Sequence, residues 1–254
     1  MIGLSASWAA QTFNFIKLDL TQFFRDRLVV ISTLLTSVSM LLAFGFGASD
    51  MKGFSNAGVN YFEYVFPGIL AIGIMFSSTY TIGYAFLVDR QRRTIEDIVL
   101  SPISYMGFIV ARVVGMLIKS ALQFVFVIVI SHFFFAVMID SFAFLTLIFV
   151  LQCIFFASLG IIISTFTNEI SFSGFVNIIL IPLTYFCGVF FPVDGFGQAK
   201  DFISLLPLSI HVDLFRAGIT GGGDLSHQVW LASAYAIVSI TVALYVFKRL
   251  LQKG

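Results

Sequence analysis

The chain has 254 residues, of which 59% are apolar and only 11% carry a charge. Soluble globular domains carry about 25% charged residues, so the polar surface here is too small for a soluble particle, and the mean hydropathy of +1.02 indicates a protein that lies in a bilayer. The net charge of +1 excludes the broad positive field by which nucleic-acid-binding proteins attract their ligand.

Six long apolar segments follow one another along the sequence. A helix needs about 20 apolar residues to cross about 30 Å of hydrocarbon, and every segment is long enough. Helices are expected because each backbone group then finds a partner within its own segment. The sequence therefore predicts an all-α integral membrane protein with six transmembrane helices, at residues 28–48, 64–88, 105–138, 142–166, 171–192 and 227–247.

Lysine and arginine predict the orientation of these helices, because cytoplasmic loops carry an excess of them. With the N-terminus inside, nine fall in inner segments and three in outer segments, which favours cytoplasmic N- and C-termini. The inner nine are Lys17, Arg25, Arg27, Arg90, Arg92, Arg93, Lys248, Arg249 and Lys253, and the outer three are Lys52, Lys200 and Arg216. Arg112 and Lys119 are expected to extend from the third helix to the cytoplasm.

The residues before the first span have a helical pattern of their own. Apolar side chains such as Phe13, Leu20 and Phe24 fall on one face, and polar ones such as Lys17 on the other. This predicts that residues 1–27 form an amphipathic helix in the inner membrane interface.

The region between the fifth and sixth spans, residues 193–224, lies outside. It is too apolar for an open loop, and Pro207, Asp213 and Arg216 interrupt it too often for a span. Irregular backbone at membrane depth is tolerated where protein surrounds it, so re-entrant helices are predicted here.

The most polar stretch follows the second span and is expected in the cytoplasm. Thr94 and Asp97 resemble a helix N-cap pattern, and Pro102 ends any helix that precedes it. A short helix over residues 90–101 is therefore predicted. Its polar side chains are Arg90, Arg92, Arg93, Thr94, Glu96 and Asp97.

Several kinds of chemistry lack a signature. No phosphate-binding loop is present, so the chain is not expected to hydrolyse ATP by that route, and the three histidines lack metal-ligand spacing. No catalytic, cofactor or metal site is predicted. The six uncharged runs contain no Asp or Glu, which argues against a proton- or sodium-driven carrier.

Two further patterns have more than one reading. Gly73, Ser77, Thr81 and Ala85 recur every four residues and form a small-residue stripe, which suits close packing either within the chain or against a second subunit. Near the outer ends of two spans lie the aromatic residues Phe133, Tyr185, Phe186 and Phe190. They either face lipid and core or line a substrate path.

The sequence resembles a known family, the membrane subunits of type-2 ABC exporters, over nearly its whole length. The most specific match is the segment 89–104, DRQRRTIEDIVLSPIS, where Arg93 replaces a frequent glycine. FPGIL at residues 66–70 is a second match. A third comprises Phe191-Pro192, Leu206-Pro207-Leu208 and Asp213-Leu214-Phe215-Arg216.

The resemblance implies that 90–101 is a coupling helix that contacts a separate ATPase subunit, with 1–27 as a connecting helix beside it. ATP and Mg²⁺ would bind to that subunit. The membrane subunit would pair as a homodimer or heterodimer, in a prokaryotic inner membrane, and export a drug, lipid, polysaccharide or other substrate. The alternatives are an anchor or sensor for an ATPase, and a passive channel or secondary carrier.

Overall fold

A computed structural model of the chain describes residues 8–47, 61–91, 105–222 and 225–251. Within these ranges, six helices are long and apolar enough to cross a membrane. They are α2 (Arg27–Gly47), α3 (Tyr61–Gln91), α5 (Tyr105–Phe135), α6 (Phe142–Phe166), α7 (Glu169–Phe186) and α10 (Ser226–Leu251). The prediction of an all-α protein with six spanning helices is confirmed.

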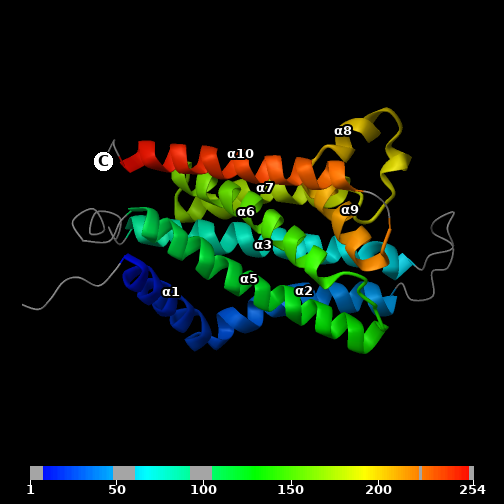
Figure 1. Cartoon of the computed structure of the whole chain (residues 1–254), viewed down its shortest axis with the longest axis horizontal. Coiled ribbons are helices and arrows are strands. Elements are labelled where there is room, and N and C mark those ends of the chain that lie inside the picture. The colour runs from blue at the N-terminus through cyan, green and yellow to red at the C-terminus, as the bar shows by residue number, and fades with distance from the viewer. Residues whose placement is uncertain (1–7, 48–60, 92–104, 223–224, 252–254) are drawn as a thin grey trace, which may run out of the picture.

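Four further elements complete the described fold. An N-terminal helix precedes the first span, and three elements lie between α7 and α10. They are α1 (Trp8–Arg25), the 3-10 helix η1 (Val193–Ala199), α8 (Lys200–Ser204) and α9 (Pro207–Thr220). Helix α1 and the end of α10 lie at one end of the bundle, and η1, α8 and α9 lie at the other (Figure 1). We call these the inner and outer ends, and the cytoplasmic position of the inner end stays a prediction.

Helices α3 and α6 form the centre of the bundle. Gly160 of α6 lies so close to α3 that a Cβ atom on it would be 2.5 Å from the Thr79 carbonyl oxygen. The Thr79 hydroxyl donates to the Phe156 carbonyl at 3.2 Å, and Gln152 Nε2 donates to the Ala71 carbonyl at 2.7 Å. Close backbone approach and polar bonds between helices take the place of a hydrophobic driving force inside a membrane.

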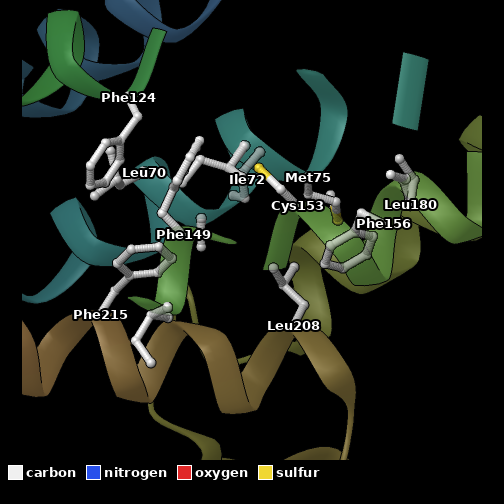
Figure 2. Packing of buried hydrophobic residues seen from close by; sticks show 14 of the residues in the cluster. Leu70, Ile72, Met75, Phe124, Phe149, Cys153, Phe156, Leu180, Leu208 and Phe215 are labelled. Atoms are coloured by element: carbon white, nitrogen blue, oxygen red, sulfur yellow. The ribbon is translucent and has the colours of Figure 1, made fainter. Parts of the chain in front are cut away.

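Aromatic side chains fill the space between this centre and its neighbours. The rings of Phe124 on α5 and Phe149 on α6 stack at 4.8 Å, and Phe215 of α9 lies 6.3 Å from Phe124 (Figure 2). Leu208 of α9 lies in the same buried cluster. The apolar face of α9 is therefore part of the core, which explains why the outer region is so apolar.

Four of the six spans differ from their predicted bounds by three or more residues. Helix α5 ends at Phe135 instead of 138, and α10 ends at Leu251 instead of 247. Helix α3 begins at Tyr61 and continues past Val88 to Gln91, whereas the prediction stopped at the first charged residue. Helix α7 ends at Phe186, six residues before the predicted end at 192. Gly188 follows it with a φ of +69°, a left-handed conformation that suits glycine and turns the chain out of the helix.

The outer elements form a sharply bent pair. Residues 193–204 and helix α9 meet at 107°, an angle too large for one straight span. Arg216 of α9 donates to the carbonyls of Tyr64 and Gly188, each at 3.3 Å, and its guanidinium lies 4.3 Å from the Tyr64 ring centroid. A bend of this size occurs in a broken span or in a re-entrant loop, so the re-entrant arrangement stays a prediction.

Candidate functional site

Helix α1 packs against α5 at the inner end and meets α2 at a sharp angle (Figure 1). The break falls at Asp26, whose Oδ1 accepts from the backbone N–H groups of Leu28 and Val29 at 3.1 and 3.3 Å. Asp26 thus caps the new helix at its unsatisfied donors. The face of α1 that turns toward the bundle carries the buried carboxylate of Asp19.

Four charged side chains from three helices meet there, and we call them the charge cluster: Asp19, Asp89, Arg112 and Lys119. Arg112 Nη1 lies 2.7 Å from Asp19 Oδ1, and its Nη2 and Nε lie 2.5 and 2.8 Å from the two oxygens of Asp89. Lys119 Nζ lies 2.6 Å from Asp19 Oδ2. The cluster therefore ties α1, α3 and α5 together through charge-assisted, partly bidentate bonds.

The spacing of residues on α5 produces this geometry. Arg112 and Lys119 are seven residues apart, which places them two turns apart on one helix face. Gly115 lies between them, and a Cβ atom on it would be 2.5 Å from Asp19 Oδ2. The absence of a side chain at Gly115 therefore lets the Asp19 carboxylate lie between the two cations.

Aromatic rings cover the cations. The Arg112 guanidinium lies 4.9 Å from the ring centroid of Phe15 and 5.6 Å from that of Phe108. Lys119 Nζ lies 5.4 Å from the Phe23 centroid. Cation–π attraction strengthens as water is removed, so Phe15 and Phe23 help α1 to hold the cluster.

The four side chains of the cluster are between 5% and 13% exposed. Their charges sum to zero, because two carboxylates face one guanidinium and one ammonium. In such a site each charge depends on its partner, and removing one partner leaves a charge without compensation. The cluster is therefore a fixed joint between the three helices.

One cavity adjoins the cluster on the side of α2 and α3, and a second cavity adjoins the first. The first, of about 690 Å³, has all four cluster residues in its wall. The second, of about 440 Å³, lies between α2, α3 and Gln123 of α5. Thr33, Tyr80, Thr81 and Tyr84 line both cavities. The two spaces are therefore neighbours along one face of α3.

The predicted small-residue stripe lies on this face. A Cβ atom on Gly73 would be 2.7 Å from Ser37 Oγ of α2 and 2.8 Å from Gln123 Nε2 of α5. Ser77 shares a hydrogen bond with Ser120 of α5 at 3.1 Å. Thr81 and Ala85 line the larger cavity. The stripe thus meets α2 and α5 of its own chain, and a contact with a second subunit stays a prediction.

The four predicted path aromatics lie elsewhere. Phe133, Tyr185 and Phe186 are exposed on the bundle surface, while Phe190 is buried with its ring 5.3 Å from Phe44. They are not among the residues that line the two cavities beside α3. Their role in a substrate path stays a prediction.

Arg90 is the one predicted coupling residue that lies within the described ranges. It donates to the carbonyls of Ser164 and Thr165 at 3.1 and 3.2 Å, and also to that of Thr167. These carbonyls end α6, where no further helical donors follow. The other predicted coupling residues, Arg92, Arg93, Thr94, Glu96 and Asp97, lie outside the described residues.

Sequence reasoning missed the two acids of the cluster. Arg112 and Lys119 were expected to extend to the cytoplasm, yet both are buried against carboxylates. One signal was available: Arg112 and Lys119 stand on one face of a predicted helix, and such a pair inside a membrane protein needs acidic partners. The described residues contain no group of histidines, cysteines and acids that is suited to hold a metal ion.

Comparison with known proteins agrees with this architecture. A model of the family described as "ABC-2 type transporter" matches residues 10–220, most of the chain. The chain belongs to the ABC-2 type transporter family. It is therefore a multi-pass integral membrane protein and the membrane subunit of a transporter.

Two relatives of this ABC-2 subunit match it almost end to end. One is named inner membrane transport permease YadH, from Escherichia coli K12, with 23% identity over 100% of this chain and 96% of the relative. The other is nodulation protein J from Bradyrhizobium diazoefficiens, with 24% identity over 97% of each chain. The similarity therefore includes α1, all six spans and the outer bent pair.

Proposed function

We propose that this chain is the membrane subunit of an ATP-driven exporter in a bacterial inner membrane, coupled to a separate ATPase subunit through residues 90–101. The family supports the transporter role, and the name of the Escherichia coli relative supports the inner membrane. The chain lacks a phosphate-binding loop, so ATP and Mg²⁺ are assigned to the partner. Two membrane subunits, identical or different, would form the path.

The observation that carries the proposal is the double attachment of the last turn of α3. Asp89 bonds to Arg112 of α5, which also holds Asp19 of α1. The next residue, Arg90, bonds to the end of α6. Residues 90–101 begin at this turn. A displacement of that segment would therefore move α1, α3, α5 and α6 together.

Such a joint suits alternating access. Nucleotide binding would draw the ATPase subunits together and move the segment at residues 90–101. The joined inner ends would follow as one body, which biases the path between inward and outward openings. In this mechanism the chain's own residues transmit force and shape the path, and no bond of the substrate changes.

The proposal is tested by isolating the full chain with its partners. The tagged protein is purified in mild detergent with and without a non-hydrolysable ATP analogue, and the partners are identified by mass spectrometry. A stoichiometric protein with a phosphate-binding loop is expected. Recovery of the chain alone under all conditions would refute the ATPase coupling and favour a passive channel or secondary carrier.

Two variants separate a coupled exporter from an anchor or sensor. Reversing the charges at Arg93 and Glu96 is expected to leave membrane insertion intact while nucleotide no longer changes the conformation of the spans. The matched control reverses Asp194 and Lys200, an exposed outer pair 2.6 Å apart. An unchanged nucleotide response in the first variant would contradict coupling through this segment.

A further inference from the structure

The wall of the smaller cavity includes a buried glutamine whose side-chain oxygen is bonded by none of the described residues. Gln123 of α5 is 4% exposed, and its amide nitrogen donates to the Ser37 hydroxyl. Among the described residues, none bonds to its Oε1 atom. A buried, unpaired amide oxygen is costly, and more so at membrane depth, where water is scarce. Gln123 is one of the residues that line the cavity, and its side chain needs only a small rotation to present the amide to a ligand there.

Gly73 contributes to this arrangement. It lies near the middle of α3, and a side chain there would collide with both Ser37 and Gln123. The glycine therefore leaves room for the amide beside the cavity. Gly73 is therefore small for a second purpose besides helix packing, because any larger residue at this position would displace the Gln123 amide.

The wall of this cavity is uncharged and mostly apolar, with hydroxyl and amide groups among the apolar side chains. Its residues are Ser32, Thr33, Thr36, Ser37, Met40, Ile69, Ile72, Gly73, Phe76, Ser77, Tyr80, Thr81, Tyr84 and Gln123. All of them lie in the described ranges, and none is acidic, basic or histidine. An ionised ligand group would find no opposite charge here, and its burial would be strongly unfavourable.

Three hydroxyls of the wall offer acceptors to a ligand. The hydroxyls of Ser32 and Thr33 donate to the Val29 carbonyl at 3.0 and 2.8 Å, and Thr36 donates to the Ser32 carbonyl at 3.1 Å. Their protons are used, while their oxygens keep lone pairs. If the Gln123 amide is turned over, its NH₂ group replaces the oxygen as the unpaired group. A ligand hydroxyl satisfies both orientations, because it donates and accepts.

An aromatic wall completes the cavity. Phe76, Tyr80 and Tyr84 recur every four residues on α3, and their rings stack at 6.2 and 5.8 Å between centroids, tilted by 12° and 19°. Tyr80 is further fixed by a 2.9 Å hydrogen bond to Asn177. These rings give the cavity apolar contact area for the C–H groups of a saturated ring or chain. The cavity volume of about 440 Å³ is in the range of small-molecule sites.

From these observations we infer that the cavity is a binding subsite for an uncharged, hydroxyl-bearing group, such as a neutral sugar or polyol head group, with Gln123 as its hydrogen-bonding anchor. The inference rests on the proposed function only in taking the cavity as part of the transport path. The charge cluster in the wall of the adjoining cavity is neutral overall, so a neutral ligand passes it without a Coulomb penalty.

The test measures binding in the absence of ATP, so that its result does not depend on ATPase coupling. The full chain is purified in a detergent without a sugar head group and placed in phosphatidylcholine nanodiscs. Native mass spectrometry then compares monoglucosyl-diacylglycerol with diacylglycerol, and isothermal calorimetry follows free maltose. We expect at least tenfold tighter binding of the glucosyl lipid, or saturable binding of maltose if the natural ligand is a free saccharide.

Two pairs of variants locate the site. Gln123→Leu is expected to lower sugar binding to the level of diacylglycerol, whereas Gln152→Leu, a buried glutamine outside the cavity wall, leaves it unchanged. Gly73→Ala is expected to weaken binding, whereas Gly174→Ala, with no atom within 4 Å of the added Cβ, does not. The glycine pair keeps the test decisive if a glutamine variant fails to fold.

Three results would overturn the assignment. The first is absence of binding for both the glucosyl lipid and maltose. The second is sugar binding that survives both Gln123→Leu and Gly73→Ala. The third is stronger binding of anionic phosphatidylglycerol than of the glucosyl lipid, which an uncharged wall cannot explain. None of these bears on whether a phosphate-loop partner copurifies, so the two proposals fail separately.

Discussion

An arginine organises each end of the bundle, but their partners differ. At the inner end Arg112 bonds to two carboxylates that are 10% exposed or less, and Lys119 shares one of them. At the outer end Arg216 bonds to two backbone carbonyls at 3.3 Å and to Asp213 in a pair that is 25% and 35% exposed. Bonds between ions are shorter and stronger than bonds to neutral acceptors.

The contrast assigns different tasks to the two ends. In the exporter proposed above, the inner end would be a joint that passes a displacement from residues 90–101 into four helices. The outer end, where Arg216 bonds mainly to neutral carbonyls, would be the exit that opens and closes. Variants at the two ends test this difference, because a loss of ionic bonds should reduce stability more than a loss of bonds to neutral carbonyls.

The largest effect is expected for Arg112→Met, which removes the guanidinium that pairs with both oxygens of Asp89 and with Asp19. The expected loss of stability is about 3–5 kcal/mol, the usual cost of breaking a buried pair. Melting of the tagged protein, followed by fluorescence-detected size exclusion, measures it. The double variant Arg112→Met/Asp89→Leu should recover much of the loss, because no charge is stranded. Equal losses in the single and double variants would contradict an ionic joint.

Lys200→Ala is the control for that experiment. Lys200 pairs with Asp194 at 2.6 Å, but both side chains are more than half exposed. Exposed ion pairs contribute little to stability, so no measurable change is expected. A large drop here would show that the outer end depends on ion pairs as the inner end does.

A smaller effect is expected for Arg90→Gln, which removes charged bonds from Arg90 to the end of α6. Hydrogen bonds to charged groups contribute about 1.5–3 kcal/mol, so the ends of α3 and α6 should separate more readily. Spin labels at the exposed positions Leu18 and Phe166 report the distance from α1 to the end of α6. The distribution of label distances is expected to be broader in Arg90→Gln than in the control variant Arg249→Gln. Identical distributions would show that Arg90 does not help to hold α3 and α6 together.

Gly115→Ala tests the fit of Asp19 without changing any charge. The added Cβ atom would lie 2.5 Å from Asp19 Oδ2, so the carboxylate has to move. Overpacking of this kind costs about 1–3 kcal/mol. Melting of Gly115→Ala against Gly174→Ala, where the added atom meets open space, isolates the effect. Equal melting temperatures for the two variants would mean that α1 can shift to make room for the added atom, so that the fit of Asp19 against Gly115 does not matter for stability.

Sequence reasoning captured the spans because their lengths and hydropathy are local properties. It missed the joint, because Asp19 and Arg112 are 93 residues apart and only packing brings them together. The carboxylate of Asp89 was taken as the end of a span, whereas the helix continues once Arg112 neutralises that charge. The end of α7 depends on the left-handed turn at Gly188, which no periodicity reveals. The sequence also did not indicate Gln123 as a binding residue, because a single amide in an apolar segment forms no pattern.

The smallest measurable effect is expected for Tyr64→Phe at the outer end. The Tyr64 hydroxyl donates to the Gly188 carbonyl at 3.1 Å, while its ring supports Arg216. Phenylalanine keeps the ring and loses the bond, which is worth about 0.5–1.5 kcal/mol. Hydrogen–deuterium exchange should therefore rise over residues 187–199 and stay unchanged in α1, with Tyr245→Phe on the exposed face of α10 as the control. An equal rise in α1 would mean that the two ends open together, and the outer end would then not be a separate gate.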